Sequence, residues 1–194
     1  MQNYNIYLIL NPNLSSENVG AELDNLNSYL VSINAVNINV NKEGLKKLAY
    51  PITKFNTGFY VNIDFDLDIF DCSKLKTIEA KINSLEGIIR YLVINQTDFL
   101  VQKSKEKKTS FDILSHRDMN KGLGNNKKCI VNAMGLREID YKDIELLSTF
   151  TSPYHKIFGK KRTGSTSKNQ RKISQAIKRA RHMALIPFTN IHEM

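Results

Sequence analysis

The sequence lacks the long apolar segments of a membrane protein. Its 194 residues contain no apolar run close to the roughly 20 residues that cross a bilayer. The longest uninterrupted runs, residues 6–10 and 91–94, have the length of strands. The first residues also lack the basic-then-apolar order of a secretory signal and the Arg-rich, acid-poor layout of an organelle presequence. We therefore expect no membrane partner and no export.

Cysteine is scarce. Cys72 and Cys129 lie 57 positions apart, so the sequence suggests neither a disulfide scaffold nor a metal-ligand pair. The four histidines share no ligand spacing with one another or with other ligands: His116, His155, His182 and His192. We expect no metal and no cofactor.

Acidic residues are absent from residues 146–192, although the chain carries 19 of them. Residues 1–100 hold 8 Lys and Arg against 11 Asp and Glu, a net charge of −3. Residues 101–194 hold 20 against 8, a net charge of +12. Such an asymmetry indicates different partners for the two halves, with the basic half facing a polyanion.

Ten cations lie in the acid-free span, and we predict that they bind RNA: Lys156, Lys160, Lys161, Arg162, Lys168, Arg171, Lys172, Lys178, Arg179 and Arg181. The last of them share a predicted helix with an apolar stripe that includes Ile173 and Ile177, so one face packs and the other binds. Phosphates favour Lys and Arg because each contact releases condensed counterions. The alternatives are a solvated helix face, which normally mixes both signs, and a membrane-surface helix, for which this alanine-rich stripe lacks aromatic anchors.

The first hundred residues alternate strand and helix patterns in the order βαββαβ. Strands are predicted at residues 4–10, 36–52 as a long strand or a bulged pair, 59–67 and 88–94. Ser15 is a predicted cap for the first helix, and apolar residues at helical spacing over 75–85 predict the second. This order predicts an α+β, ferredoxin-like domain with a four-stranded antiparallel sheet and two helices on one face.

Three segments follow from these patterns. Residues 1–100 form the ferredoxin-like domain, 101–126 a basic flexible linker, and 127–194 a small basic helical domain. In the last segment Asp140 is predicted to cap a helix that runs to about residue 150. Ser167, with Gln170 three positions later, has the form of a capping box and predicts a helix to about residue 185.

The last segment resembles bacterial small-subunit ribosomal protein number eighteen over about residues 127–190. The resemblance lies in the motifs Ile139-Asp140-Tyr141-Lys142-Asp143, Thr163-Gly164-Ser165, Gln170-Arg171-Lys172, Ala176-Ile177-Lys178-Arg179-Ala180-Arg181 and Ala184-Leu185-Ile186-Pro187-Phe188. It implies a helical domain that binds the central domain, or platform, of small-subunit ribosomal RNA.

The first segment resembles small-subunit ribosomal protein number six. The motifs are Leu10-Asn11-Pro12-Asn13, Gly44-Leu45-Lys46-Lys47-Leu48-Ala49-Tyr50-Pro51-Ile52, Gly58-Phe59-Tyr60 and Ile89-Arg90-Tyr91-Leu92-Val93. The two families form a pair on the platform, so the resemblance implies that the halves pack on each other as a fused heterodimer among neighbouring ribosomal proteins. A linker of about 25 residues would hold each half near the other at millimolar effective concentration.

The last segment departs from the family of ribosomal protein number eighteen in the loop before Thr163. Where that family has a glycine, a proline and two arginines, this sequence has His155, Gly159, Lys160 and Lys161. Some relatives bind zinc through a CxxC pair near the start of this domain. Here Asn132 stands three residues after Cys129, so we predict no zinc.

The first half offers weaker candidates. Lys46, Lys47, Lys54 and Arg90 are possible contacts to RNA or to the other half. Four aromatic residues could stack on bases, but their place in alternating strands favours packing: Tyr50, Phe59, Tyr60 and Tyr91.

These observations predict a structural constituent of the small ribosomal subunit, in the cytoplasm or, alternatively, in an organelle. The alternative function is a free RNA-binding translational regulator. We expect no enzyme, because the sequence has no glycine-rich phosphate loop and no nucleophile beside a base. Asp64, Asp66 and Asp68 alternate on one predicted strand and are expected to be solvent-facing.

Overall fold

The computed structural model describes residues 1–68, 72–96, 130–134, 136 and 138–189. The chain divides into two compact units, Met1–Thr97 and Asp98–Met194. The linker predicted at residues 101–126 lies outside the described residues, as do Cys129, His116 and His192.

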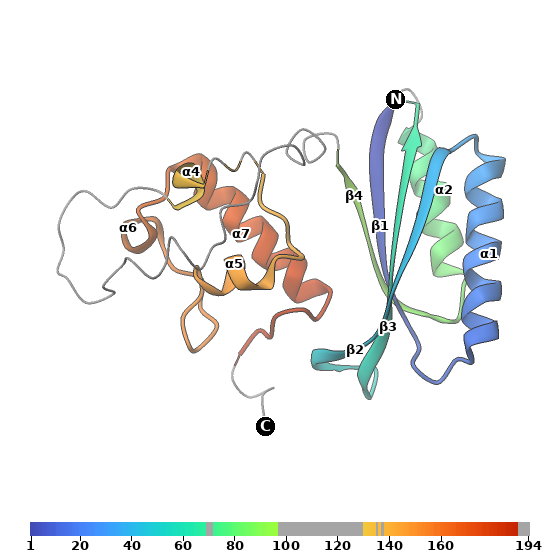
Figure 1. Cartoon of the computed structure of the whole chain (residues 1–194), viewed down its shortest axis with the longest axis horizontal. Coiled ribbons are helices and arrows are strands. Elements are labelled where there is room, and N and C mark those ends of the chain that lie inside the picture. Colours follow the sequence, from blue (N-terminus) through green and yellow to red (C-terminus); the bar gives the residue numbers. More distant parts are fainter. Residues whose placement is uncertain (69–71, 97–129, 135, 137, 190–194) are drawn as a thin grey trace. The chain divides into compact units, whose positions relative to one another are not determined.

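The first unit is a four-stranded antiparallel sheet with two helices on one side (Figure 1). The strand order is β2-β3-β1-β4, which confirms the predicted α+β, ferredoxin-like fold. Its elements are β1 (Gln2–Leu10), α1 (Ser16–Ser32), β2 (Val36–Ile52), β3 (Phe55–Leu67), α2 (Cys72–Asn83) and β4 (Ile88–Asn95).

The core of this unit lies between the sheet and the helices. Alternate residues of β1 and β3 point into it, and apolar residues of α1 and α2 meet them: Ile6, Leu8, Leu10, Val61, Ile63, Phe65, Val19, Leu23, Leu26, Leu30, Ile78 and Ile82. Ser15 caps α1 as predicted, since its hydroxyl accepts a hydrogen bond from the Asn18 amide at 3.2 Å.

Strand β2 is long and bulged. Its register against β3 shifts at three places, one of them between Lys42 and Gly44, where Gly44 has a φ of 87°. The β2–β3 hairpin closes on Thr53 and Lys54, with φ values of 49° and 73°. Two successive positive φ angles match the right-handed twist of a tight hairpin, so Lys54 is placed at its tip.

The helix-free face of the sheet carries a ladder of amides and carboxylates. Asn5, which is fully buried, donates to Asn62 and to Asp64, the latter at 2.6 Å. Asp66 accepts hydrogen bonds from Asn3 at 2.8 Å and from Asn37 at 2.7 Å. Asp64 and Asp66 are thus half-buried and held by asparagines from neighbouring strands, a contact that the sequence did not reveal, whereas Asp68 is exposed. Across the described residues, no group of three or more His, Cys, Asp or Glu is arranged to hold a metal ion.

The second unit is helical. Its elements are α4 (Ile130–Ala133), α5 (Ile144–Ser148), α6 (Lys160–Thr163) and α7 (Ser167–His182). The apolar stripe of α7 is buried, and α5 packs on α7. The buried residues of the stripe are Ile173, Ala176, Ile177 and Ala180. No described helix is both long and apolar enough to cross a membrane.

Two helix starts differ from the prediction. Asp143, not Asp140, caps α5, and it accepts from the Leu146 amide at 3.1 Å. Asp140 instead accepts from the Lys142 amide at 3.0 Å, a local turn that delays the helix. Helix α7 is likewise capped one residue before the predicted Ser167, by the hydroxyl of Thr166.

Candidate nucleic-acid interface

Seven of the ten predicted RNA-binding cations are exposed in the second unit. They come from the segment before α6, from α6 itself and from the outer side of α7. We call these seven the basic surface: Lys156, Lys160, Lys161, Arg162, Lys168, Arg171 and Lys178. The structure therefore brings most of the predicted cations to the solvent side of one small unit.

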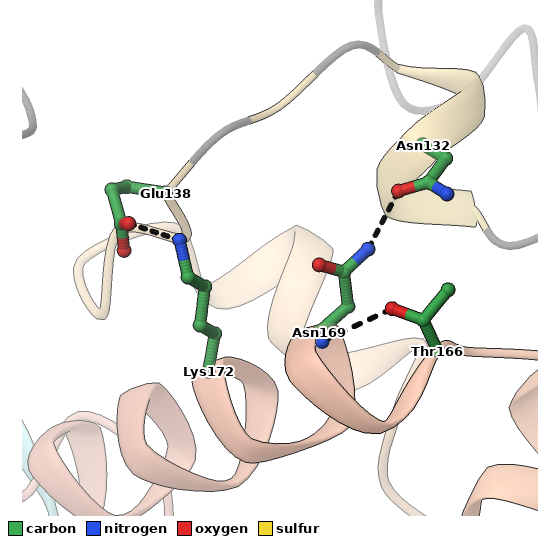
Figure 2. Close-up of polar contacts among 5 residues, drawn as sticks. All are labelled: Asn132, Glu138, Thr166, Asn169 and Lys172. Atoms are coloured by element: carbon green, nitrogen blue, oxygen red, sulfur yellow. Dashed lines mark hydrogen bonds and ion pairs between the residues drawn. The ribbon is translucent and has the colours of Figure 1, made fainter.

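Lys172 has a structural partner. Its ammonium forms an ion pair with the carboxylate of Glu138, and both side chains are about four-fifths buried, at 24% and 20% exposure. Figure 2 shows this pair beside a second contact, in which Asn169 donates to Asn132 at 2.7 Å. Together the two contacts fasten the segment before α5 to the first turns of α7.

Arg179 and Arg181 are also partly buried. Burial lowers the pKa of Arg181, and burial is also the main cause of a lowered pKa at Arg179, where Tyr141 and Glu138 act in the opposite direction. Arg181 donates to the carbonyl of His155. It also lies over the ring of Phe188, 5.6 Å from its centre. Arg181 thus contacts other parts of the second unit, and Arg179 is partly buried, so we do not include either arginine in the exposed set of cations.

A side-chain amide fixes the position of α6. Gln170 accepts from the Thr163 hydroxyl at 3.1 Å and donates to the Phe158 carbonyl at 2.8 Å. It therefore ties both ends of α6 to α7 and does not form the predicted capping box. Gly164 ends α6 with a φ of 67°, a left-handed conformation that glycine adopts without strain.

The same arrangement orients Arg162. Its guanidinium carbon lies 3.7 Å from the centre of the Phe158 ring, so the side chain is stacked on an aromatic platform while it stays exposed. Sequence reasoning listed Arg162 only as a charge. The stacking partner four positions earlier in the sequence is a signal that it did not use.

The candidates of the first unit fall into two groups. Lys46 pairs with Glu43 at 2.7 Å, and Arg90 donates to the Tyr50 hydroxyl at 2.6 Å. Lys47 and Lys54 are exposed. Two of the four candidates therefore have polar partners within the first unit, and two are exposed lysines.

Three of the four aromatic candidates of the first unit are buried or pack against its core. Tyr60 is fully buried, and its burial raises the pKa of its hydroxyl, with Tyr50 and Glu43 nearby adding to the rise. Phe59 and Tyr91 pack against the core beneath the helices. The packing interpretation is confirmed for Phe59, Tyr60 and Tyr91, whereas Tyr50 is half-buried and accepts a hydrogen bond from Arg90.

Comparison with known proteins gives a match for each unit. The family model of ribosomal protein S6 matches residues 3–95, and that of ribosomal protein S18 matches residues 135–186. The small ribosomal subunit protein bS6 of Fusobacterium nucleatum subsp. nucleatum is 38% identical over 96 residues, which cover 50% of this chain and 99% of that protein. A solved structure, 30S ribosomal protein S6 from Thermotoga maritima, is 24% identical with a TM-score of 0.46, and the match covers 52% of this chain and 92% of that chain.

The two matches do not overlap, and they fall in separate compact units. The relative from Fusobacterium nucleatum is matched over almost its whole length by the first unit alone. The chain therefore belongs to the ribosomal protein S6 family through its first unit, and the same polypeptide carries a second region that matches the family model of ribosomal protein S18.

Proposed function

We propose that this chain is a structural constituent of the small ribosomal subunit that binds the central domain of its RNA through the basic surface. The observation that carries the proposal is the set of seven exposed cations inside a span of 47 residues without an acidic residue. The acidic residues described in the second unit all precede this span: Glu138, Asp140, Asp143 and Glu145. Neither α6 nor α7 therefore contains an acidic residue that would offset the seven exposed cations.

Phosphate is the counter-charge that fits this surface. Lys and Arg contacts to RNA phosphates release condensed counterions, and the exposed guanidinium of Arg162 beside the Phe158 ring can form paired hydrogen bonds with a phosphate. The role we propose is architectural.

A salt series on the full chain tests this proposal. The full chain should bind a transcript of the central domain of small-subunit RNA with log K falling linearly against log salt. The variant Lys168→Gln with Lys178→Gln should lose about 0.9 of slope for each charge removed. The control, Lys42→Gln with Lys76→Gln, removes two exposed charges from the first unit and should leave the slope unchanged. Equal losses in both variants would contradict the assignment of the RNA to the basic surface.

We also propose that the two units pack on each other as a fused pair. The opposite net charges of the two halves support this, as does the joining of two ribosomal protein families in one chain. A protease site inserted between residues 101 and 126 allows the test. After cleavage, the two fragments should elute together on gel filtration at micromolar concentration, whereas separate elution would contradict the pairing.

A further inference from the structure

A short hairpin joins α5 to α6 and carries the most exposed large hydrophobic side chain among the described residues. Thr151 and Ile157 form an antiparallel bridge. In the next pair away from the tip, the Phe158 amide donates to the Phe150 carbonyl at 2.8 Å. We call this segment the 151–157 hairpin. Tyr154, at its tip, is 71% exposed.

The tip of the hairpin is held by four hydrogen bonds. The His155 amide donates to the Ser152 carbonyl at 2.8 Å, which closes a turn with Pro153 at its second position and Tyr154 at its third. Ser152 also donates its amide to the Lys156 carbonyl at 2.8 Å and accepts from the Lys156 amide, through its hydroxyl, at 3.0 Å. The fourth bond runs from Arg181 of α7 to the His155 carbonyl. The ring of Tyr154 is thus presented from a fixed backbone.

The surroundings of this ring are cationic. Lys156 stands two residues further along the same hairpin, and Arg162 is stacked on Phe158 at its foot. Because Arg181 reaches the hairpin from α7, the exposed Lys178, one helical turn earlier, lies on the same side of that helix. An apolar protein partner would have to bury these charges, whereas a nucleic acid would neutralise them.

We propose that Tyr154 stacks on an unpaired base of the RNA, while the neighbouring cations hold its backbone. The inference rests on the proposed RNA-binding function and adds a base contact to it. A tyrosine ring gives stacking energy to any base, and a preformed turn avoids the entropy cost of ordering it on binding. The stacking contact would increase the affinity for RNA and fix the position of the protein along it, without adding a charged contact.

The test uses the full chain and the central-domain transcript. Tyr154→Ala should weaken binding about 5- to 100-fold at every salt concentration, with the salt slope unchanged, and Tyr154→Phe should bind like the natural chain. Since the ring is exposed, neither change should unfold the unit. Lys156→Gln provides the contrast, because it should lower the slope by about 0.9.

A second readout reports stacking directly. The chain contains no tryptophan, so Tyr154→Trp introduces a single tryptophan at the tip, whose emission can be excited apart from that of the tyrosines. Its emission should be quenched when the transcript binds, whereas the emission of the control Val31→Trp, at an exposed position of α1, should change little.

Loss of affinity without quenching, or unchanged affinity in Tyr154→Ala, would overturn the stacking contact and leave the RNA-binding role of the basic surface intact. Unchanged RNA affinity with weaker retention on assembled subunits would assign Tyr154 to a neighbouring protein. No salt-dependent binding by the natural chain would remove the proposed function and this contact together.

Discussion

Gly58 occupies a position in β3 where a side chain would collide with the sheet. A Cβ atom there would lie 2.6 Å from Cγ2 of Ile9, which is fully buried, and 3.4 Å from Cδ2 of Leu48. Neither neighbour can move into water without exposing apolar surface. The packing of Ile9 from β1 and Leu48 from β2 over β3 at this point therefore depends on glycine.

We expect Gly58→Ala to lower the free energy of unfolding of the first unit by about 1–3 kcal/mol, the usual cost of overpacking. Gly20, in α1, is the matched control, since a Cβ there meets nothing within 4 Å. Gly20→Ala should raise stability by about 0.5–1 kcal/mol, because alanine favours the helix. Urea unfolding followed by circular dichroism measures both. A neutral Gly58→Ala would show that the strands adjust at little cost.

The backbone of His155 is in a strained conformation. Its φ of 56° lies in the left-handed region, after the turn of the 151–157 hairpin, where a three-residue loop normally places glycine. The S18 family, which this region resembles, has a glycine near this position. The positive φ of His155 gives a physical reason for a glycine there.

His155→Gly should therefore stabilise the second unit by about 0.5–1 kcal/mol through relief of this strain. Hydrogen exchange of the α7 amides in the full chain gives the free energy of opening. His155→Ala keeps the strain and serves as the control. The hypothesis fails if alanine and glycine stabilise the unit equally, because the effect would then come from the loss of the imidazole.

Tyr60 links the burial of a single hydroxyl to the pH dependence of the first unit. Its pKa is raised in the folded state, so the unfolded chain releases this proton first. The contribution is fully present below about pH 10, the ordinary pKa of tyrosine, and is lost as pH rises above it. Tyr60→Phe should show a smaller loss of stability between pH 10 and 12 than the natural chain, as measured by urea unfolding. An identical pH profile would mean that the hydroxyl reaches water in the folded state.

At the scale of elements, α7 carries cations of two kinds. Lys172 is paired with Glu138 and largely buried, whereas Lys178, six positions later, is exposed. The sequence shows both only as lysines on one helix. Glu138 lies 34 positions before Lys172, so no local pattern reveals the pair.

The same substitution at the two lysines separates their roles. Lys172→Met should cost about 1 kcal/mol of stability, because it leaves a mostly buried carboxylate without its partner, and should change the salt slope of RNA binding little. Lys178→Met should leave stability unchanged and lower the slope by about 0.9. Hydrogen exchange and the salt series on the full chain supply the two readouts. A slope that falls equally in both variants would refute the distinction.

The long elements were predictable, and the two shortest helices were not. The strands and α1, α2 and α7 span enough residues for apolar periodicity to identify them. Helices α4 and α6 have only four residues each, too few to show a period. The caps of α5 and α7 were misplaced because cap-forming residues stand close together, and only tertiary contacts, such as those of Gln170, decide between them.

At the scale of the whole molecule, the charge of the chain follows its two family matches. The region that matches S6 lies in the acidic half and the region that matches S18 lies in the basic half, so one polypeptide carries two surfaces with different expected partners. The predicted boundaries at residues 100 and 127 and the predicted linker stay predictions. Joining the two units fixes their ratio at one to one, which is what a permanent component of an assembly requires.

The most direct test of this account is quantitative co-sedimentation of the full chain with ribosomal subunits from its own cells. We predict one copy of the chain per small subunit, retained through a sucrose gradient at physiological salt, with little in the ribosome-free fraction. A chain found mainly in the ribosome-free fraction, far below one copy per subunit, would contradict a structural role and favour a free RNA-binding regulator.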